Sequence, residues 1–154
     1  MGWLNYYGAA IMAVIMIPNI IFAVKNKGAA GGNSGAEETG GTRAYTNKIA
    51  VILEQIGRYG CLILMIFNIP YTYFGFWFGN ALTVYLCVNG GLCAAYIIFW
   101  IICWNRNGKL KALSLSVIPS VIFIFSGAVL ADIPLLVFAA VFAVNHILIS
   151  YKSV

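Results

Sequence analysis

Glu54 and Arg58 are charged residues that stand inside a long apolar stretch of this 154-residue chain. They are four positions apart, which places them on one face of a helix in the order that favours an ion pair. Charged side chains within a membrane are costly, so they usually face a bundle interior or a watery cavity. The pair therefore indicates a polar site within the membrane. The alternative is a self-neutralised pair that reaches toward the membrane surface.

Three further polar residues belong with this pair: the amides Asn19 and Asn145, and His146, the single histidine of the chain. Imidazole titrates near neutral pH, so His146 could move protons, and Glu54 could act as a base. The alternative for His146 is a packing residue whose hydrogen bonds are satisfied within the fold. We predict that these three residues and the charged pair form one ligand-binding set.

Established catalytic and cofactor motifs do not accompany these residues. The sequence has no HExxH, GxSxG or GxxxxGK[ST] pattern. A metal held by Glu54 and His146 would need a third ligand that the sequence does not identify, and a single histidine excludes a bis-histidine haem site. The four cysteines show no CxxC spacing and fit small packing residues. We predict neither a metal nor a cofactor.

The composition places much of the chain in lipid. Hydrophobic residues make up 62% of it, charged residues 8%, and the mean hydropathy is +0.93. A soluble domain carries about 25% charged residues, and a soluble fold of this length could not bury so much apolar surface. The formal charge of +5 does not predict nucleic-acid binding, because the basic residues form no stripe with interleaved aromatic residues.

Five apolar runs predict an all-α fold, an integral membrane bundle of five transmembrane helices in a single domain over residues 1–154. The expected helices span about 3–24, 46–78, 81–104, 112–130 and 133–151. The second run exceeds the roughly 20 residues that a span needs, so we expect residues 59–78 to cross and the preceding turns to lie at the interface. The segment 25–45 is rich in glycine and is predicted to be a flexible cytoplasmic loop.

The basic residues predict the orientation. Apart from Arg58, every Lys and Arg lies within 25–48, within 106–111 or at Lys152, between or after the apolar runs. Short loops rich in Lys and Arg stay on the cytoplasmic side of a membrane. We therefore predict a multi-pass protein of the cytoplasmic membrane whose N-terminus lies outside and whose C-terminus lies in the cytoplasm.

This orientation brings the predicted site residues to one depth. Asn19 lies near the inner end of the first run, Glu54 and Arg58 near that of the second, and Asn145 and His146 near that of the fifth. Polar groups gathered in the cytoplasmic third of the membrane predict a pocket that opens to the cytoplasm.

Small and polar residues recur at helical spacing in every run, which predicts a compact bundle with a partly polar interior. In the third run the expected inward stripe consists of Asn80, Thr83, Cys87, Gly90 and Ala94; in the fourth it consists of Ser116, Ser120, Phe123 and Gly127.

Three prolines fall inside predicted helices, at positions 18, 70 and 119. Each removes a backbone donor and leaves one carbonyl without its helical partner, at Val14, Ile66 and Leu115 respectively. Neighbouring groups can satisfy such carbonyls in membranes. We expect kinked helices, either beside a cavity or within a static bundle.

These features favour a small membrane protein that binds a small or amphipathic solute, for transport or sensing. Transport by so short a chain would need a homo-oligomer or a partner membrane subunit. One alternative is a membrane-embedded enzyme that acts on a lipid or isoprenoid head group, with Arg58 on the phosphate and Glu54 or His146 moving protons. Another is a non-catalytic accessory or immunity-type protein, which outward-facing stripes of small residues would support. The expected partners are the bilayer and a small-molecule or lipid ligand, with no nucleic acid.

Overall fold

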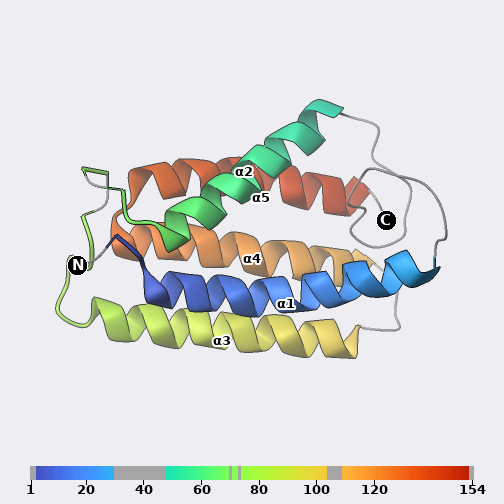
Figure 1. The fold of residues 1–154 in the computed structure, drawn as a ribbon, viewed down its shortest axis with the longest axis horizontal. Helices are drawn as coiled ribbons and strands as arrows, with labels where there is room; N and C mark the ends of the chain where they lie inside the picture. Colours follow the sequence, from blue (N-terminus) through green and yellow to red (C-terminus); the bar gives the residue numbers. More distant parts are fainter. Residues whose placement is uncertain (1–2, 30–47, 70, 73, 104–108, 153–154) are drawn as a thin grey trace.

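Five α-helices make up a computed structural model of the chain, and the described part contains no β-strand, so the all-α prediction is confirmed. The structure describes residues 3–29, 48–69, 71–72, 74–103 and 109–152, without the side chains of residues 19, 22–29 and 109–113. The helices are α1 (Tyr6–Ala29), α2 (Lys48–Ile66), α3 (Ala81–Ile102), α4 (Lys109–Leu130) and α5 (Ile133–Lys152) (Figure 1).

Three of these helices, α2, α3 and α5, are long and apolar enough to cross a membrane. They contain 19, 22 and 20 residues, which corresponds to roughly 28–33 Å at 1.5 Å per residue and matches a hydrocarbon core of about 30 Å. Large apolar side chains such as Ile56, Ile98 and Val144 are more than half exposed on their outer surfaces. Lipid rather than water is the solvent that suits such a surface.

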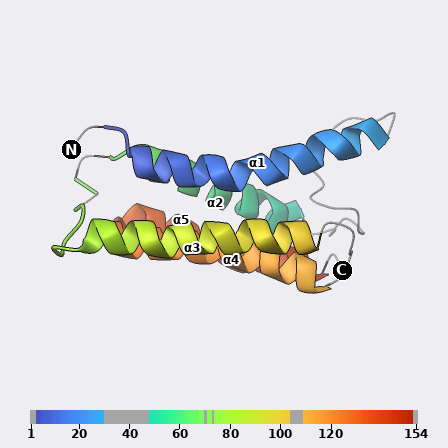
Figure 2. The same cartoon turned by 90° about the horizontal axis from the view of Figure 1, so that it is seen from below.

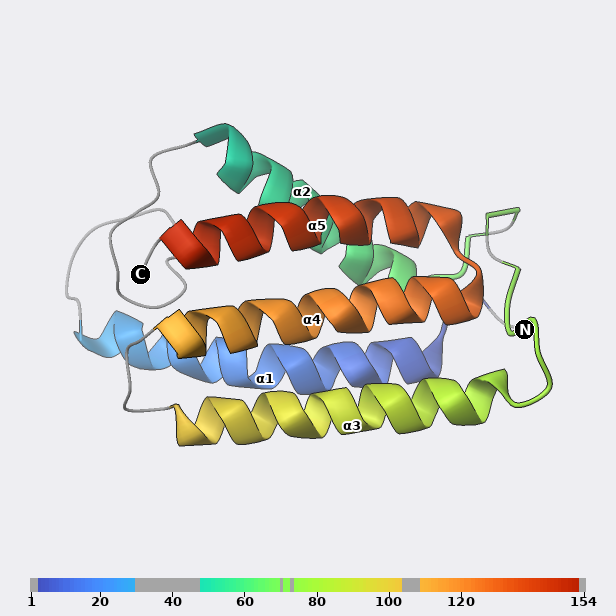
Figure 3. The ribbon, with the colours of Figure 1, turned by 180° about the vertical axis from the view of Figure 1, so that it is seen from behind.

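The helices form a ring in the order α1, α2, α5, α4, α3, and α3 closes the ring against α1. The most extensive contacts join α5 to α2 on one side and to α4 on the other. Helix α2 crosses α5 obliquely, whereas α4 and α5 run side by side (Figures 1 and 3). The fifth helix is therefore the central element that positions groups from two neighbours.

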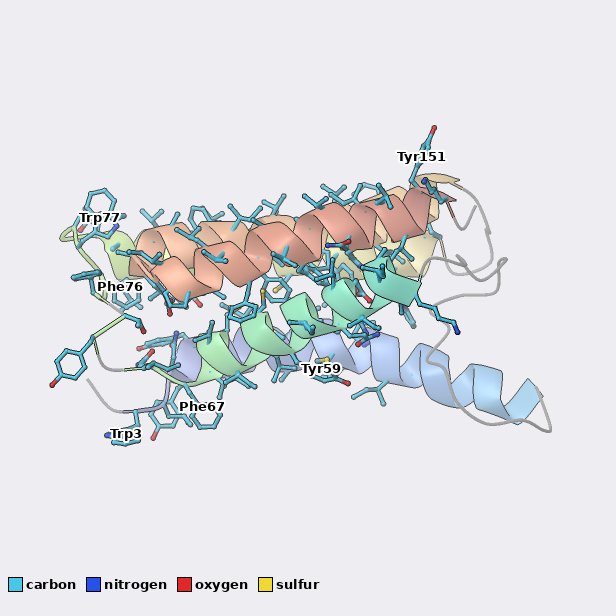
Figure 4. All side chains as sticks on the ribbon, turned by 90° about the horizontal axis from the view of Figure 1, so that it is seen from above. Trp3, Tyr59, Phe67, Phe76, Trp77 and Tyr151 are labelled. Atoms are coloured by element: carbon cyan, nitrogen blue, oxygen red, sulfur yellow. The ribbon has the colours of Figure 1, made fainter. Side chains whose placement is uncertain are left out.

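The chain passes back and forth between two ends of the bundle. Helices α1, α3 and α5 begin at one end, and α2 and α4 begin at the other (Figures 1 and 2). We call the first the aromatic end, because Trp3, Phe67, Phe76 and Trp77 gather there, away from Tyr151 (Figure 4). The second is the basic end, which holds the end of α1, the start of α2, the end of α3, the start of α4 and the end of α5.

Helix α2 ends at Ile66, so the predicted helix over 46–78, and with it a crossing by residues 59–78, is wrong. Proline at position 70 disfavours helical geometry in the residue before it. Beyond it the backbone turns left-handed, with φ of 73° at Tyr71 and 82° at Gly75. Pro18 and Pro119, in contrast, do lie within helices, as predicted.

The end of α2 is held by the beginning of the chain. The Asn5 N–H donates to the Ile66 carbonyl at 2.8 Å, and the Asn68 N–H donates to the Trp3 carbonyl at 3.0 Å. Ile66 carries the carbonyl that Pro70 leaves without a helical partner. Its acceptance of a bond from Asn5 shows how the fold satisfies a backbone group that a membrane could not solvate.

The predicted inward stripe is confirmed in α4 and wrong in α3. Every residue of the predicted stripe in α4 is buried, as expected. In α3 the predicted stripe is exposed, and the buried residues are instead Ala81, Tyr85, Asn89, Cys93 and Tyr96. Large tyrosines fill the interior here, and Asn89 forms a buried hydrogen-bonded pair with Ser126 of α4, Nδ2 to Oγ 3.2 Å.

Candidate functional site

Glu54 is buried in α2, with 6% of its side chain exposed. Arg58, one turn further along the helix, places Nη2 at 2.5 Å from the Oε1 atom of Glu54. The ion pair predicted from the four-residue spacing is thus formed. Arg58 keeps 27% of its side chain exposed, so the pair joins a buried carboxylate to a guanidinium that is partly accessible.

His146 reaches the same carboxylate from α5. Its Nδ1 atom lies 3.1 Å from Oε1 of Glu54. Because a carboxylate only accepts hydrogen bonds, Nδ1 carries a hydrogen in this contact. The other ring nitrogen, Nε2, is then an acceptor in neutral imidazole and a donor in imidazolium. Phe142 stacks on the ring, with centroids 4.6 Å apart and planes at 20°, and fixes its orientation.

The close crossing of α2 and α5 makes this contact possible. A Cβ atom added to Gly57 would lie 2.8 Å from the backbone nitrogen of Phe142 and 2.9 Å from its Cα. One turn further, Gly60 lies against the ring of Phe138. The two glycines therefore let α5 approach α2 at the level of Glu54. These glycines contribute to the site by allowing this close helix crossing. In the sequence, only their spacing of three residues could have predicted such a contact.

The other predicted site residues do not join the cluster through a described contact. Asn145 donates from Nδ2 to the Val141 carbonyl of its own helix at 2.8 Å. The side chain of Asn19 lies outside the described part of the structure, although its backbone belongs to α1. The roles of both residues in ligand binding stay predictions. Next to Glu54, Gln55 has a buried Oε1 atom with no hydrogen-bond partner in the described part, which adds it as a candidate.

The cluster lies at one depth, as the orientation argument requires. Glu54 is six residues from the start of α2 at Lys48, and His146 is six residues from the end of α5 at Lys152. At 1.5 Å per residue both are about 9 Å from the basic end of the bundle. Two helices that run in opposite directions therefore deliver an acid and an imidazole to the same level.

The arrangement can hold a proton and attract an anion. Glu54 and Arg58 neutralise each other, so protonation of His146 would leave the cluster with one positive charge, shared between Nε2 and the guanidinium. Phosphate and carboxylate groups are the usual partners of such cations. Among the described residues no group of three or more His, Cys, Asp or Glu side chains could hold a metal ion.

A surface groove follows the outward side of α5 near the cluster. Its lining is almost entirely apolar and consists of Ala143, Val144, Ile147, Leu148, Tyr151 and Lys152. None of Glu54, Arg58 and His146 contributes to this lining. The groove shares α5 with His146 and ends at a lysine, but Val144 and Leu148, two residues before and after His146, lie on the opposite side of the helix from its side chain.

No protein-family model matches the chain, and neither a curated protein nor a solved structure matches it. The chemistry of the Glu54–Arg58–His146 cluster and the groove on α5 therefore carries the functional conclusion.

Proposed function

We propose that this chain is a five-span protein of the cytoplasmic membrane that binds a small amphipathic solute at the Glu54–Arg58–His146 cluster, for transport or sensing. The N-terminus lies outside and the basic end of the bundle faces the cytoplasm. Binding takes place from the cytoplasmic side, where Arg58 and protonated His146 receive an anionic group of the solute.

The packing of the helices supports five spans. Helices α1 and α4 contain 24 and 22 residues, a length that suits a membrane span. Both lie in the ring beside helices that are apolar enough to cross. The segments that carry basic residues all begin or end at one end of the bundle, which supports a cytoplasmic position for that end.

The single observation that carries the binding proposal is a buried carboxylate shared by two helices. Oε1 of Glu54 takes both the contact with Arg58 in α2 and the contact with His146 in α5. A solute anion that draws Arg58 or His146 away from this oxygen changes the link between α2 and α5. Binding and helix rearrangement are thereby coupled through one atom, which is what a transporter or a sensor requires.

The groove on α5 supports an amphipathic solute rather than a purely polar one. An acyl or aryl group placed along Val144 and Leu148 would have Lys152, at the end of the groove, as the partner for an anionic head. Burial of each methylene contributes about 0.8 kcal/mol, so even a short chain would contribute substantially to affinity.

Native mass spectrometry of the gently purified protein tests this proposal. We expect a bound small amphipathic molecule on the parent protein and about a tenfold to hundredfold loss of its affinity in Arg58→Gln and His146→Gln, because each variant removes a charge-assisted hydrogen bond. Tyr71→Phe, at the exposed aromatic end, is the matched control and should bind as the parent does. If both site variants are stable and keep full occupancy, the binding proposal is wrong. Turnover of the bound molecule, lost in both variants, would point to an enzyme instead.

The outward face of α3 favours a second role, an interface with another membrane helix. Thr83, Cys87, Gly90 and Ala94 are exposed, and a Cβ added to Gly90 would meet no atom within 4 Å. Small residues at such spacing let membrane helices approach closely. This face suits the homo-oligomer or partner subunit that transport by a short chain would need.

Oxidative cross-linking tests this face. Cys87 is an exposed thiol outside any disulfide. If two copies meet through α3, a mild oxidant applied to membranes should give a disulfide-linked dimer that disappears in Cys87→Ser and weakens several-fold in Gly90→Leu. A dimer band that persists unchanged in Cys87→Ser would exclude contact between two copies at this position.

A further inference from the structure

The corner between α4 and α5, at the aromatic end, contains a buried carboxylic acid. Helix α4 ends at Leu130, and the next residue, Ala131, lies in the left-handed region with φ 48°. The Asp132 N–H then donates to the Gly127 carbonyl at 2.9 Å, which closes the helix end. Oδ1 of Asp132 accepts the Leu135 N–H at 3.0 Å and caps the start of α5. Only 1% of Asp132 is exposed.

Residues 74–80, which precede α3, pack onto this corner, and we call them the outer cap. The Gly75 N–H donates to the Leu130 carbonyl at 3.1 Å, and Nε1 of Trp77 donates to the Ala128 carbonyl at 3.3 Å. Between them, the Phe76 ring meets the Tyr85 ring edge-on, with centroids 5.8 Å apart. The cap is thus joined to the last turn of α4 by two hydrogen bonds and to α3 by a ring contact.

Among the described residues, no Lys, Arg or His forms an ion pair with Asp132. Its Oδ2 atom is buried and has no hydrogen-bond partner in the described part of the structure. Residues 59–105 and 112–151 contain no Lys or Arg, and Asp132 is their only acid. Besides Asp132, the titratable groups that the structure describes at this end are Tyr85, buried in α3, the exposed Tyr71 before the cap, and the exposed Tyr6 and Tyr7 at the start of α1.

A carboxylate without a partner is much costlier to bury than the neutral, protonated acid. Burial raises the pKa of Asp132 above its ordinary range, and the hydrogen bond from the Leu135 N–H opposes this only in part. The closed corner therefore holds a proton more tightly than an open, hydrated corner would. Acid favours the closed state, and the preference falls as the pH rises.

We propose that Asp132 is a proton-binding site that controls the outer cap. With the proton bound, the corner is neutral and the cap stays closed over it. When the O–H bond breaks, the proton passes to water at the outer surface and its electron pair stays on the carboxylate, which then requires water and opens the cap at Gly75 and Trp77. The inference rests on the proposed function only for the placement of this end on the outer side of the membrane. It gives the protein a proton-responsive gate at the end of the bundle opposite the solute site.

Hydrogen exchange in Asp132→Asn tests the inference. Asparagine keeps the shape of the side chain and an oxygen that can cap Leu135, but it cannot ionise. Intrinsic exchange rates cancel when parent and variant are compared at the same pH. For the protein in nanodiscs, we expect equal exchange of residues 74–80 near pH 4 and roughly tenfold faster exchange in the parent near pH 9. Equal exchange at both pH values would overturn the inference.

Infrared difference spectroscopy provides an independent measurement. We expect the parent protein near pH 4 to show the carbonyl band of a protonated buried acid that disappears near pH 9, and we expect this band to be missing in Asp132→Asn. Its absence from the parent would equally overturn the inference. Arg58→Gln should leave both results unchanged, so failure of the solute site and failure of the proton site are distinguishable.

Discussion

Replacement of Gly57 by alanine is expected to lower the free energy of unfolding by about 2 kcal/mol, the range of an overpacked helix contact. The added methyl group would lie within 2.9 Å of the backbone of Phe142, and backbone atoms cannot turn aside as a side chain can. Helices α2 and α5 must therefore move apart. Since His146 reaches Glu54 across this crossing at 3.1 Å, we also expect their contact to break.

Unfolding in mixed micelles, followed by circular dichroism, measures the stability effect, and solute occupancy measures the effect on the site. Gly90→Ala is the matched control, because its methyl group would meet no atom within 4 Å on the outer face of α3. Helix propensity favours that alanine by about 1 kcal/mol, so the control should be neutral or slightly more stable. A Gly57→Ala variant as stable as Gly90→Ala would show that the helices do not cross as closely as described.

The importance of Gly57 illustrates what the sequence could and could not predict. Hydropathy predicts the helices well, since any run of about 20 apolar residues must satisfy its backbone internally in lipid. The spacing of Glu54 and Arg58 predicts their ion pair, because residues four positions apart are neighbours on the face of a helix. For Glu54 and His146 the sequence predicted only that they lie at the same depth in the membrane, not that they are in contact. Which faces of two helices meet depends on packing, and hydropathy does not specify it.

The end of α2 shows a second limit. The apolar run continues to residue 78, and prolines within membrane helices are common enough that Pro18 and Pro119 are accommodated in α1 and α4. In contrast, α2 ends at Ile66, before the proline of its apolar run. The difference lies in a distant segment, because Asn5 supplies the donor that satisfies Ile66 and lets the chain leave the helix. Such a partner cannot be identified from the local sequence.

The inward face of α3 shows a third limit. Small residues were expected to face the interior, and the face with Tyr85, Asn89 and Tyr96 was found there instead. Small residues mark close helix contacts but not whether the contact is made within the chain or with another chain. Here the large side chains of Tyr85 and Tyr96 fill the interior, and the small residues of α3 face outward.

Replacement of Glu54 by leucine is expected to cost about 3 kcal/mol of stability. The substitution leaves Arg58 and His146 without the carboxylate that both contact. Loss of one partner of a fully buried pair costs about 3–5 kcal/mol. The lower end applies here, because 27% of the Arg58 side chain is exposed and its charge retains some solvation.

The double variant Glu54→Leu/Arg58→Leu separates stability from function. Apolar replacement of a whole buried ion pair is often neutral, so we expect the double variant to regain stability to within about 1 kcal/mol of the parent. Its affinity for the solute should nevertheless fall tenfold to hundredfold, as in Arg58→Gln, because the guanidinium that receives the anion is gone. Unfolding and native mass spectrometry on the parent, both single variants and the double variant complete the cycle.

The cycle also discriminates between the alternatives for this cluster. A double variant that is stable and fully occupied would show that the pair serves only to neutralise two charges within the membrane. A double variant as unstable as Glu54→Leu would show that the carboxylate stabilises the fold mainly through His146, across the α2–α5 crossing. A solute site predicts recovered stability together with weakened binding. The solute needs the positive charge of Arg58, whereas the stability of the bundle does not depend on it.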